Sequence, residues 1–290
     1  MHRFSQLIRE NQSRTPLTVA ERRQQMEHRQ ARLRPGNEYR EHNFNLGGRA
    51  ARWIETPNAR DGHVVLYLHG GAYIMGSIDT HRELMIRVSQ TCAARVLAID
   101  YRLAPEHPFP AALEDAQAAY RWLLAQDLPA SRLMLAGDSA GGGLALATLL
   151  ALRDAGTALP AGAILLSPWT DLSLSGTSIT SRAAVEPMLA LDVLRDSAAG
   201  YRGGNDARHP LISPHFGEFH GLPPLLIQVG DAEILLDDSR RLASAAKSAG
   251  VAVEFDIWPE AFHVFQMFPQ LPETTSALSA IGRFFKHHAG

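Results

Sequence analysis

From about residue 38 onward, short apolar runs alternate with longer stretches whose apolar residues recur every three to four positions. The later runs, such as VVLYLH, AILLSP and PLLIQVG, are almost continuously hydrophobic, which is typical of strands covered on both faces of a sheet. The longer stretches between them have the period of helices that pack on such a sheet. The pattern predicts strands at 38–45, 50–56, 63–69, 95–101, 133–138, 162–168, 224–230 and 253–259, and helices at 80–93, 112–126, 140–156, 236–250 and 274–287.

This order of elements predicts an α/β fold with one eight-stranded, mostly parallel, doubly wound sheet and antiparallel strands at its start. One gap is too long for a simple crossover, because more than 50 residues separate the strand ending near Ser167 from the one starting near Pro224. The gap contains a helical stretch, LALDVLRDSAAGYR, and several turns. We interpret residues 172–220 as an insertion over the C-terminal edge of the sheet, where open α/β sheets bind ligands.

The first 37 residues also fall outside the alternation, and we separate them from the main domain at 38–290. The stretch TVAERRQQMEHRQARLR is highly charged and helical in pattern, with Thr18 and Glu21 placed as a capping box. Glutamates and glutamines are interspersed among its arginines, and no aromatic residues accompany them. We therefore expect a solvated helix lying across the main domain rather than a nucleic-acid arm.

Composition narrows the class of protein. The 290 residues are 46% hydrophobic, enough for a large core, and the net charge of −2 gives no basic surface for nucleic acid or an anionic membrane. No stretch of 18 uncharged apolar residues occurs, and the first ten residues lack the apolar core of a signal peptide, so we expect a cytoplasmic protein. The single cysteine, Cys92, excludes an intramolecular disulfide. We expect no metal, because the histidines lack paired ligand spacing, and no nucleotide cofactor, because the glycine-rich motifs are missing.

The most specific motif is Gly137-Asp138-Ser139-Ala140-Gly141, between a predicted buried strand and a predicted helix. In that setting Gly-x-Ser-x-Gly is a nucleophile elbow: a strained turn lifts the serine above the sheet, at a helix N-terminus that favours negative charge. Ser139 is therefore the candidate nucleophile, and it needs a base, an acid to orient that base, and donors for an oxyanion.

The base and the acid follow the serine along the chain in this type of fold. Among the last histidines, His263 lies in a loop just after a predicted strand, whereas His287 and His288 end a helix, where a cation suits the dipole. We choose His263 as the base. The candidates for the acid follow the strand PLLIQVG and are Asp231, Glu233 and Asp237. Asp237, like Asp238, is explained as a residue of the first turn of a helix. The pattern alone does not decide between Asp231 and Glu233.

Oxyanion donors are expected from the residue after the nucleophile, Ala140, and from the loop after an earlier strand. The strand HVVLYL ends in His69-Gly70-Gly71-Ala72-Tyr73. Its glycines allow the backbone to approach a substrate carbonyl and to turn amides toward it. We expect the donors among Gly70, Gly71, Ala72 and Ala140.

Three linked motifs resemble those of the hormone-sensitive-lipase-like esterases, the bacterial family IV. They are His69-Gly70-Gly71, the run from Asp100 to Pro110 (DYRLAPEHPFP) and Gly137–Gly142 (GDSAGG). The resemblance covers roughly residues 60–290. It implies an α/β-hydrolase core with a helical cap, the cap being built from the N-terminal segment and the insertion. The run after Tyr101 then looks like a bracing loop, with His107 in a structural role, and Asp138 helps to hold the elbow.

The chain departs from the family pattern at two positions. Ala72 stands where the family has a third glycine; alanine keeps the amide but is restricted at positive φ. The family often shows Asp-Pro-Leu-x-Asp after the seventh strand, and that register places Glu233 at the position of the catalytic Asp. A glutamate can orient histidine with one methylene more of reach, so we favour Glu233 over Asp231 as the acid.

The resemblance implies a cofactor-independent serine esterase that hydrolyses short-chain carboxylic esters through an acyl-enzyme. A lactone hydrolase or deacetylase with the same triad is the alternative, and a non-catalytic receptor of this fold is disfavoured because every catalytic position is filled. Tyr73, Trp169 and Met188 are expected to line the pocket under the cap. The expected binding partner is a small-molecule ester, and we expect binding to neither nucleic acid nor a membrane. Assembly with a second copy of the chain as a homodimer is left open.

Overall fold

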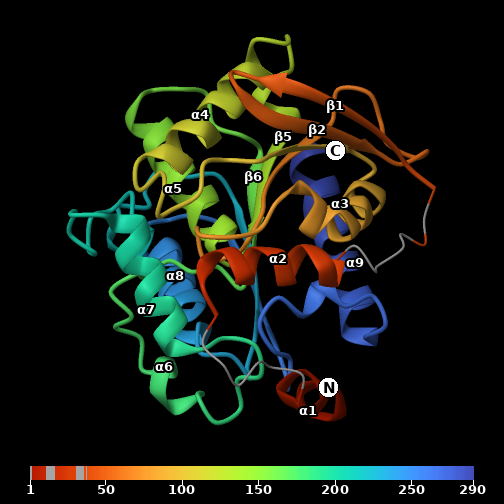
Figure 1. Cartoon of the computed structure of the whole chain (residues 1–290). Coiled ribbons are helices and arrows are strands. Elements are labelled where there is room, and N and C mark those ends of the chain that lie inside the picture. The colour runs from red at the N-terminus through yellow and green to blue at the C-terminus, as the bar shows by residue number, and fades with distance from the viewer. Residues whose placement is uncertain (1, 11–16, 31–35, 37) are drawn as a thin grey trace.

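The computed structural model describes residues 2–10, 17–30, 36 and 38–290, and its centre is a twisted sheet with helices on both faces (Figure 1). Its strands run in the order β1-β2-β4-β3-β5-β6-β7-β8; β1, β2 and β4 pair antiparallel, and all other neighbours pair parallel. The expected eight-stranded, mostly parallel sheet is confirmed. The strands are β1 (Arg40–Leu46), β2 (Arg49–Glu55), β3 (Val64–Leu68), β4 (Arg95–Ile99), β5 (Leu133–Asp138), β6 (Gly162–Leu166), β7 (Leu225–Gly230) and β8 (Val253–Trp258).

Alternate side chains of the central strands enter two hydrophobic layers. Val65 and Tyr67 of β3 point into the layer formed with α3 (Ile78–Cys92) and α9 (Pro272–Ala289). Their neighbours Val64, Leu66 and Leu68 point into the layer formed with α4 (Ala111–Leu124), α5 (Ala140–Asp154) and α8 (Leu236–Ser248). Because both faces are covered, the central strands need apolar residues at every position, as their sequences show.

The helices of the main domain begin and end within about two residues of their predicted bounds. The start of α3 is earlier than expected because Ser77 and Thr80 cap each other's backbone groups, which fixes the first turn at Ile78. Sequence analysis missed α1 (His2–Glu10), the short α6 (Ser178–Ser181) and the 3-10 turns at Ala130–Arg132, Pro214–Phe216 and Phe265–Met267.

The N-terminal helix α2 (Val19–Gln30) has the predicted capping box, since Thr18 N–H donates to Glu21 Oε2 at 2.8 Å and Glu21 N–H donates to Thr18 Oγ at 3.3 Å. Arg23 fastens this helix to the main domain. Its guanidinium donates to the carbonyls of Ile74 and Ala104 and forms a two-pronged ion pair with Glu106. The helix thus lies across the loop that follows β3 and the loop that follows β4.

The long segment between β6 and β7 contains α6 and α7 (Leu191–Arg202), and both lie on the same side of the molecule as α2 (Figure 1). The ring of Tyr201 in α7 stacks on that of Tyr73 in the loop after β3, with centroids 3.7 Å apart. In the described part of the chain, every helix is too short or too polar to cross a bilayer.

Candidate active site

Ser139 occupies the turn between β5 and α5 with φ of 52° and ψ of −122°, a conformation that L-residues rarely adopt. The turn is crowded on both sides: a Cβ on Gly137 would overlap the backbone of Gly141, and a Cβ on Gly141 would overlap the carbonyl of Leu68. Only glycine fits at these two positions. The sequence motif therefore enforces a geometry that presents the Ser139 side chain at the N-terminus of α5.

The structure brings His263 and Glu233 together across 30 residues of sequence. His263 Nδ1 lies 2.7 Å from Glu233 Oε2, and both side chains are buried, with 3% and 0% of their surfaces exposed. Because Nδ1 is occupied by this hydrogen bond, Nε2 is the nitrogen that can exchange a proton with a serine. No direct hydrogen bond joins the two described side chains of Ser139 and His263 in this conformation, and such bonds often form only in a substrate complex.

The environment of His263 favours its protonated form. Burial by itself would lower the pKa of the imidazole, but the carboxylate of Glu233 outweighs burial, and Glu186 and Asp138 act in the same direction. The net effect raises the pKa of His263 above its ordinary value. A stronger base at this position is what proton abstraction from a hydroxyl requires.

Ser167, at the end of β6, connects the acid to the histidine loop, and sequence analysis missed it. Its hydroxyl donates to Glu233 Oε1 at 2.8 Å and accepts the N–H of Val264 at 3.1 Å. The N–H of Gly230 donates to the same oxygen of Glu233 at 2.8 Å. The only early signal was the position of Ser167 at the carboxyl end of a central strand, where ligand-binding residues of such sheets gather.

Asp231, the alternative acid, lies elsewhere. Its Oδ1 accepts the N–H of Glu260 at 2.7 Å, which closes the turn after β8. Asp237 and Asp238 belong to the first turn of α8, as expected from the pattern. Of the three carboxylates considered for the acid, Glu233 is the one in contact with His263.

Three of the four expected oxyanion donors remain available. Within the described chain, no group accepts a hydrogen bond from the N–H of Gly71, Ala72 or Ala140. The Gly70 N–H, in contrast, donates to Asp138 Oδ1 at 3.1 Å, so this amide is already engaged in the present conformation. Ala72 adopts φ of 54° despite its side chain, which agrees with an alanine replacing a glycine in a left-handed position.

Asp138 holds the oxyanion loop rather than the backbone of its own turn. Its Oδ1 also accepts the hydroxyl of Tyr67 at 2.8 Å, and its Oδ2 lies 3.3 Å from Nε2 of His81, a fully buried residue of α3. Burial opposes the charge on Asp138, but His81 and Tyr67 lower the pKa of the carboxyl, and Asp138 in turn raises the pKa of His81. The carboxylate and the imidazole therefore form a buried acid–base contact, which sequence analysis missed because it did not consider His81.

Two of the three expected pocket residues are buried in this conformation. Tyr73 and Trp169 have only 1% and 0% of their surfaces exposed, so neither offers a wall to a ligand in this conformation. Their rings pack together at 6.1 Å, and Tyr201 covers Tyr73 from the other side. These two aromatic side chains pack in the core near the Ser139 turn and α7, because their burial removes a large apolar area from water. Met188 is half-buried, against a cluster that includes Phe262.

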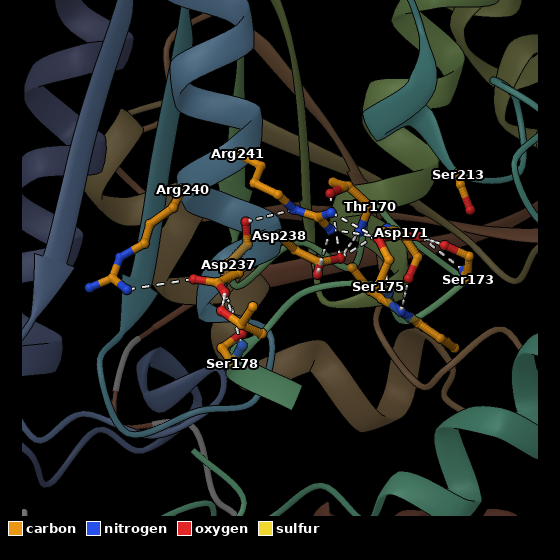
Figure 2. A network of polar contacts seen from close by, with 12 residues as sticks. Thr170, Asp171, Ser173, Ser175, Ser178, Ser213, Asp237, Asp238, Arg240 and Arg241 are labelled. Carbon is orange, nitrogen blue, oxygen red and sulfur yellow. Dashed lines mark hydrogen bonds and ion pairs between the residues drawn. The ribbon is translucent and has the colours of Figure 1, made fainter. Parts of the chain in front are cut away.

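The segment after β6 is fastened to α8 by an acidic network (Figure 2). Asp238 accepts the N–H groups of Thr170 and Asp171 at 2.8 and 2.9 Å, and the carboxylate of Asp171 binds Ser175 and the guanidinium of Arg241. Burial, together with the nearby charge of Asp171, raises the pKa of Asp238 to about 7. Because α8 starts just after Glu233, this network fixes the segment that follows β6 close to the candidate acid.

Ser139 is almost fully buried, with 6% of its surface exposed. Among the residues that the structure describes, no three His, Cys, Asp or Glu side chains are grouped so as to hold a metal ion. The arrangement joins a strained serine, a basic histidine with a buried carboxylate partner, and unused amides at a helix N-terminus. This combination can support nucleophilic attack on a carbonyl.

Known proteins share this architecture. A family model for the alpha/beta hydrolase fold matches residues 65–267. An acetyl-hydrolase of Streptomyces hygroscopicus is 52% identical over 246 residues, 84% of this chain and 82% of that protein. An esterase of Acinetobacter venetianus is 38% identical over 223 residues, 76% and 74% of the two chains. The crystal structure of an esterase from the bacterial hormone-sensitive lipase family has a TM-score of 0.96 and 43% identity, covering 100% of this chain and 98% of that one.

The chain therefore belongs to the α/β-hydrolase family. Within it, the protein is a member of the bacterial hormone-sensitive-lipase-like esterases and an enzyme of the carboxylic ester hydrolase class.

Proposed function

We propose that this esterase hydrolyses short-chain carboxylic esters through an acyl-enzyme, with Ser139 as nucleophile, His263 as base and Glu233 as the acid that orients His263. The observation that carries the proposal is the 2.7 Å contact between His263 Nδ1 and Glu233 Oε2, formed in the same site as the strained Ser139 turn. A carboxylate on Nδ1 holds the proton there, so that Nε2 can accept the proton of the serine.

The reaction proceeds in two halves. Ser139 Oγ attacks the ester carbonyl while its proton passes to His263 Nε2, and the N–H groups of Gly71, Ala72 and Ala140 stabilise the oxyanion. Collapse of the tetrahedral intermediate breaks the bond to the alcohol, which leaves with the proton from His263. Water then loses a proton to His263 and attacks the acyl carbon. The second collapse breaks the bond to Ser139 Oγ, which takes the proton back from His263 as the carboxylic acid leaves.

The preference for short acyl chains rests on a cap that we propose to consist of residues 1–37 and the insertion at 172–220. Residues 1, 11–16, 31–35 and 37 of this cap lie outside the described residues. The contacts of Arg23 fasten α2 over the loop after β3, and Phe4 of α1 stacks on Phe262, the neighbour of His263, with ring centroids 5.9 Å apart. A site enclosed in this way limits the volume of the acyl group. Similarity to an acetyl-hydrolase supports the same preference.

A chain-length series of p-nitrophenyl esters from acetate to dodecanoate tests the substrate range. We expect the highest kcat/KM at or below about eight carbons and little activity on emulsified triglyceride. Faster turnover of long-chain emulsions than of soluble short esters contradicts the enclosed pocket. A lactone series run in parallel distinguishes an esterase from a lactone hydrolase.

The variant Ser139→Ala tests the nucleophile. Removing a triad serine costs on the order of a million-fold in kcat, and the thermal midpoint is the control for folding. Incubation with a serine-directed organophosphonate should add one adduct mass to the wild-type protein, on the peptide containing Ser139, and none to the variant. An active variant, or labelling that persists in it, refutes the assignment.

A further inference from the structure

Glu186 is a buried carboxylate of the inserted segment, in the stretch between α6 and α7, and the proposed reaction gives it no role. Only 8% of its surface is exposed. Its Oε1 accepts the N–H groups of Met188 and Leu189 at 2.7 and 3.1 Å, and its Oε2 accepts the N–H of Ile234 at 3.1 Å. Two of these bonds are local, but the third crosses to the residue that follows Glu233.

Both backbone polar groups of Ile234 are held by the inserted segment. Glu186 takes the N–H, and the hydroxyl of Ser178 in α6 donates to the carbonyl at 2.6 Å. The same hydroxyl accepts the N–H of Asp237 at 2.9 Å, at the start of α8. The turn that carries Glu233 is therefore clamped from the insertion side, whereas Ser167 and Gly230 hold the Glu233 carboxylate from the sheet side.

The charge of Glu186 also lies within electrostatic range of the site. The pKa of Glu186 is raised above its ordinary value, because burial and the charge of Glu233 outweigh His263 and the backbone N–H donors, which lower it, so the three groups influence one another electrostatically. Three N–H donors directed at the two oxygens favour the ionised form, which only accepts hydrogen bonds. The groups that act on His263 from the elements around it are Glu233, Glu186 and Asp138.

We propose that Glu186 is a positioning residue for the triad: it clamps the turn that carries Glu233, and it adds a second carboxylate to the buried surroundings of that turn. The inference rests on the proposed function, since it assigns Glu186 a part in that same triad. It means that the insertion is a component of the catalytic apparatus in addition to a cover for the substrate.

The pH dependence of kcat/KM separates this role from a merely structural one. The acid limb of that profile reports the pKa of the free enzyme's base. Glu186→Gln keeps the size of the side chain and removes its charge, so His263 should deprotonate more easily. We expect the acid limb to move to lower pH by about half a unit or more, with kcat reduced about tenfold by the loosened turn.

Asp237→Asn is the matched control. Asp237 also ties the insertion to this turn, because its carboxylate accepts the N–H of Ser178 at 2.9 Å, but it is not among the charges that act on His263. We expect this variant to lower the thermal midpoint and to leave the acid limb in place. An unshifted profile in Glu186→Gln, or an equal shift in both variants, overturns the inference.

Two further measurements keep the test decisive. The proton between His263 and Glu233 should give a far-downfield NMR signal, which can be followed without turnover. In Glu186→Gln the titration of this signal should move to lower pH. A titration that does not move overturns the inference. If Glu186→Gln does not fold, Glu186→Asp keeps the charge on a shorter side chain. The expected result is a wild-type acid limb with reduced kcat, and an unchanged kcat refutes the clamp.

Ser139→Ala, measured in parallel, separates the two levels of the argument. A Ser139→Ala variant that still hydrolyses esters disproves the proposed function, whatever Glu186→Gln does. An inactive Ser139→Ala variant beside an unshifted Glu186→Gln profile disproves only the role of Glu186.

Discussion

Replacing Glu233 by glutamine removes one charge from the centre of the site while keeping nearly the same shape. The carboxylate accepts three hydrogen bonds: Oε1 takes those of Ser167 and Gly230, and Oε2 takes that of His263. Glutamine has one oxygen and one NH2 group, so it cannot serve all three donors. Either the histidine side or the sheet side of the residue must receive the NH2 group.

The two orientations have different costs. If NH2 faces the sheet, it meets two donors, the Ser167 O–H and the Gly230 N–H, and leaves the buried Gly230 N–H unpaired, at about 1–3 kcal/mol. If NH2 faces His263, Nδ1 must accept, and the imidazole proton moves to Nε2, where it blocks transfer from Ser139. The second orientation preserves the fold and gives the wrong tautomer. Loss of the orienting carboxylate in a serine triad costs about 10⁴-fold in kcat, or about 5 kcal/mol of barrier.

The assay is kcat on p-nitrophenyl acetate, with the thermal midpoint as the measure of folding and Asp231→Asn as the control. Asparagine at position 231 keeps an oxygen that can accept the N–H of Glu260, so we expect kcat within about threefold of wild type. An inactive Asp231→Asn variant beside a nearly normal Glu233→Gln variant would show that the acid has been wrongly assigned.

Other parts of the site give further expected outcomes. Ser167→Ala, which loses the contacts to Glu233 and Val264, should lower kcat by about ten- to a hundredfold with a small change in thermal midpoint. The acid limb of the wild-type kcat/KM profile should have its midpoint above pH 6.5, because the raised pKa of His263 keeps the base protonated to higher pH. His81→Asn should lower the free energy of unfolding by about 3 kcal/mol near pH 6. Because the pKa of His81 is raised in the folded protein, His81 stabilises the fold fully below pH 6.5, and this stabilisation declines as the pH rises through the folded-state pKa. The loss measured by denaturant titration should therefore be smaller at about pH 9. Deleting residues 1–35 should reduce activity or solubility, and an undiminished truncated enzyme would contradict the proposed cap.

The sequence determined the sheet and the elbow because both depend on local chemistry. Continuous apolar runs specify strands buried on both faces, and their order along the chain fixes which of them pair in parallel. Gly137 and Gly141 flank Ser139 because no side chain fits beside that turn, so the strained geometry could be inferred from five residues. The capping box of Thr18 and Glu21 is similarly a matter of neighbouring residues.

The tertiary structure decided the contacts that join distant segments. Which carboxylate meets His263 depends on how two loops converge after β7 and β8, and the difference between Asp231 and Glu233 is a matter of ångströms that no periodicity encodes. Ser167 and Glu186 came from segments without a motif, so nothing in the sequence marked them as neighbours of Glu233.

The same limit explains where the surroundings of individual residues differ from what the sequence suggests. Gly70 has the residue type of an oxyanion donor, but its N–H is taken by Asp138 from the neighbouring strand. Tyr73 and Trp169 lie near the expected edge of the sheet, yet both rings are buried, because Tyr73 packs on Tyr201 of α7 and on Trp169. A sequence states what a side chain can do, whereas its direction is set by the packing of all its neighbours at once, and that packing exists only in the folded chain.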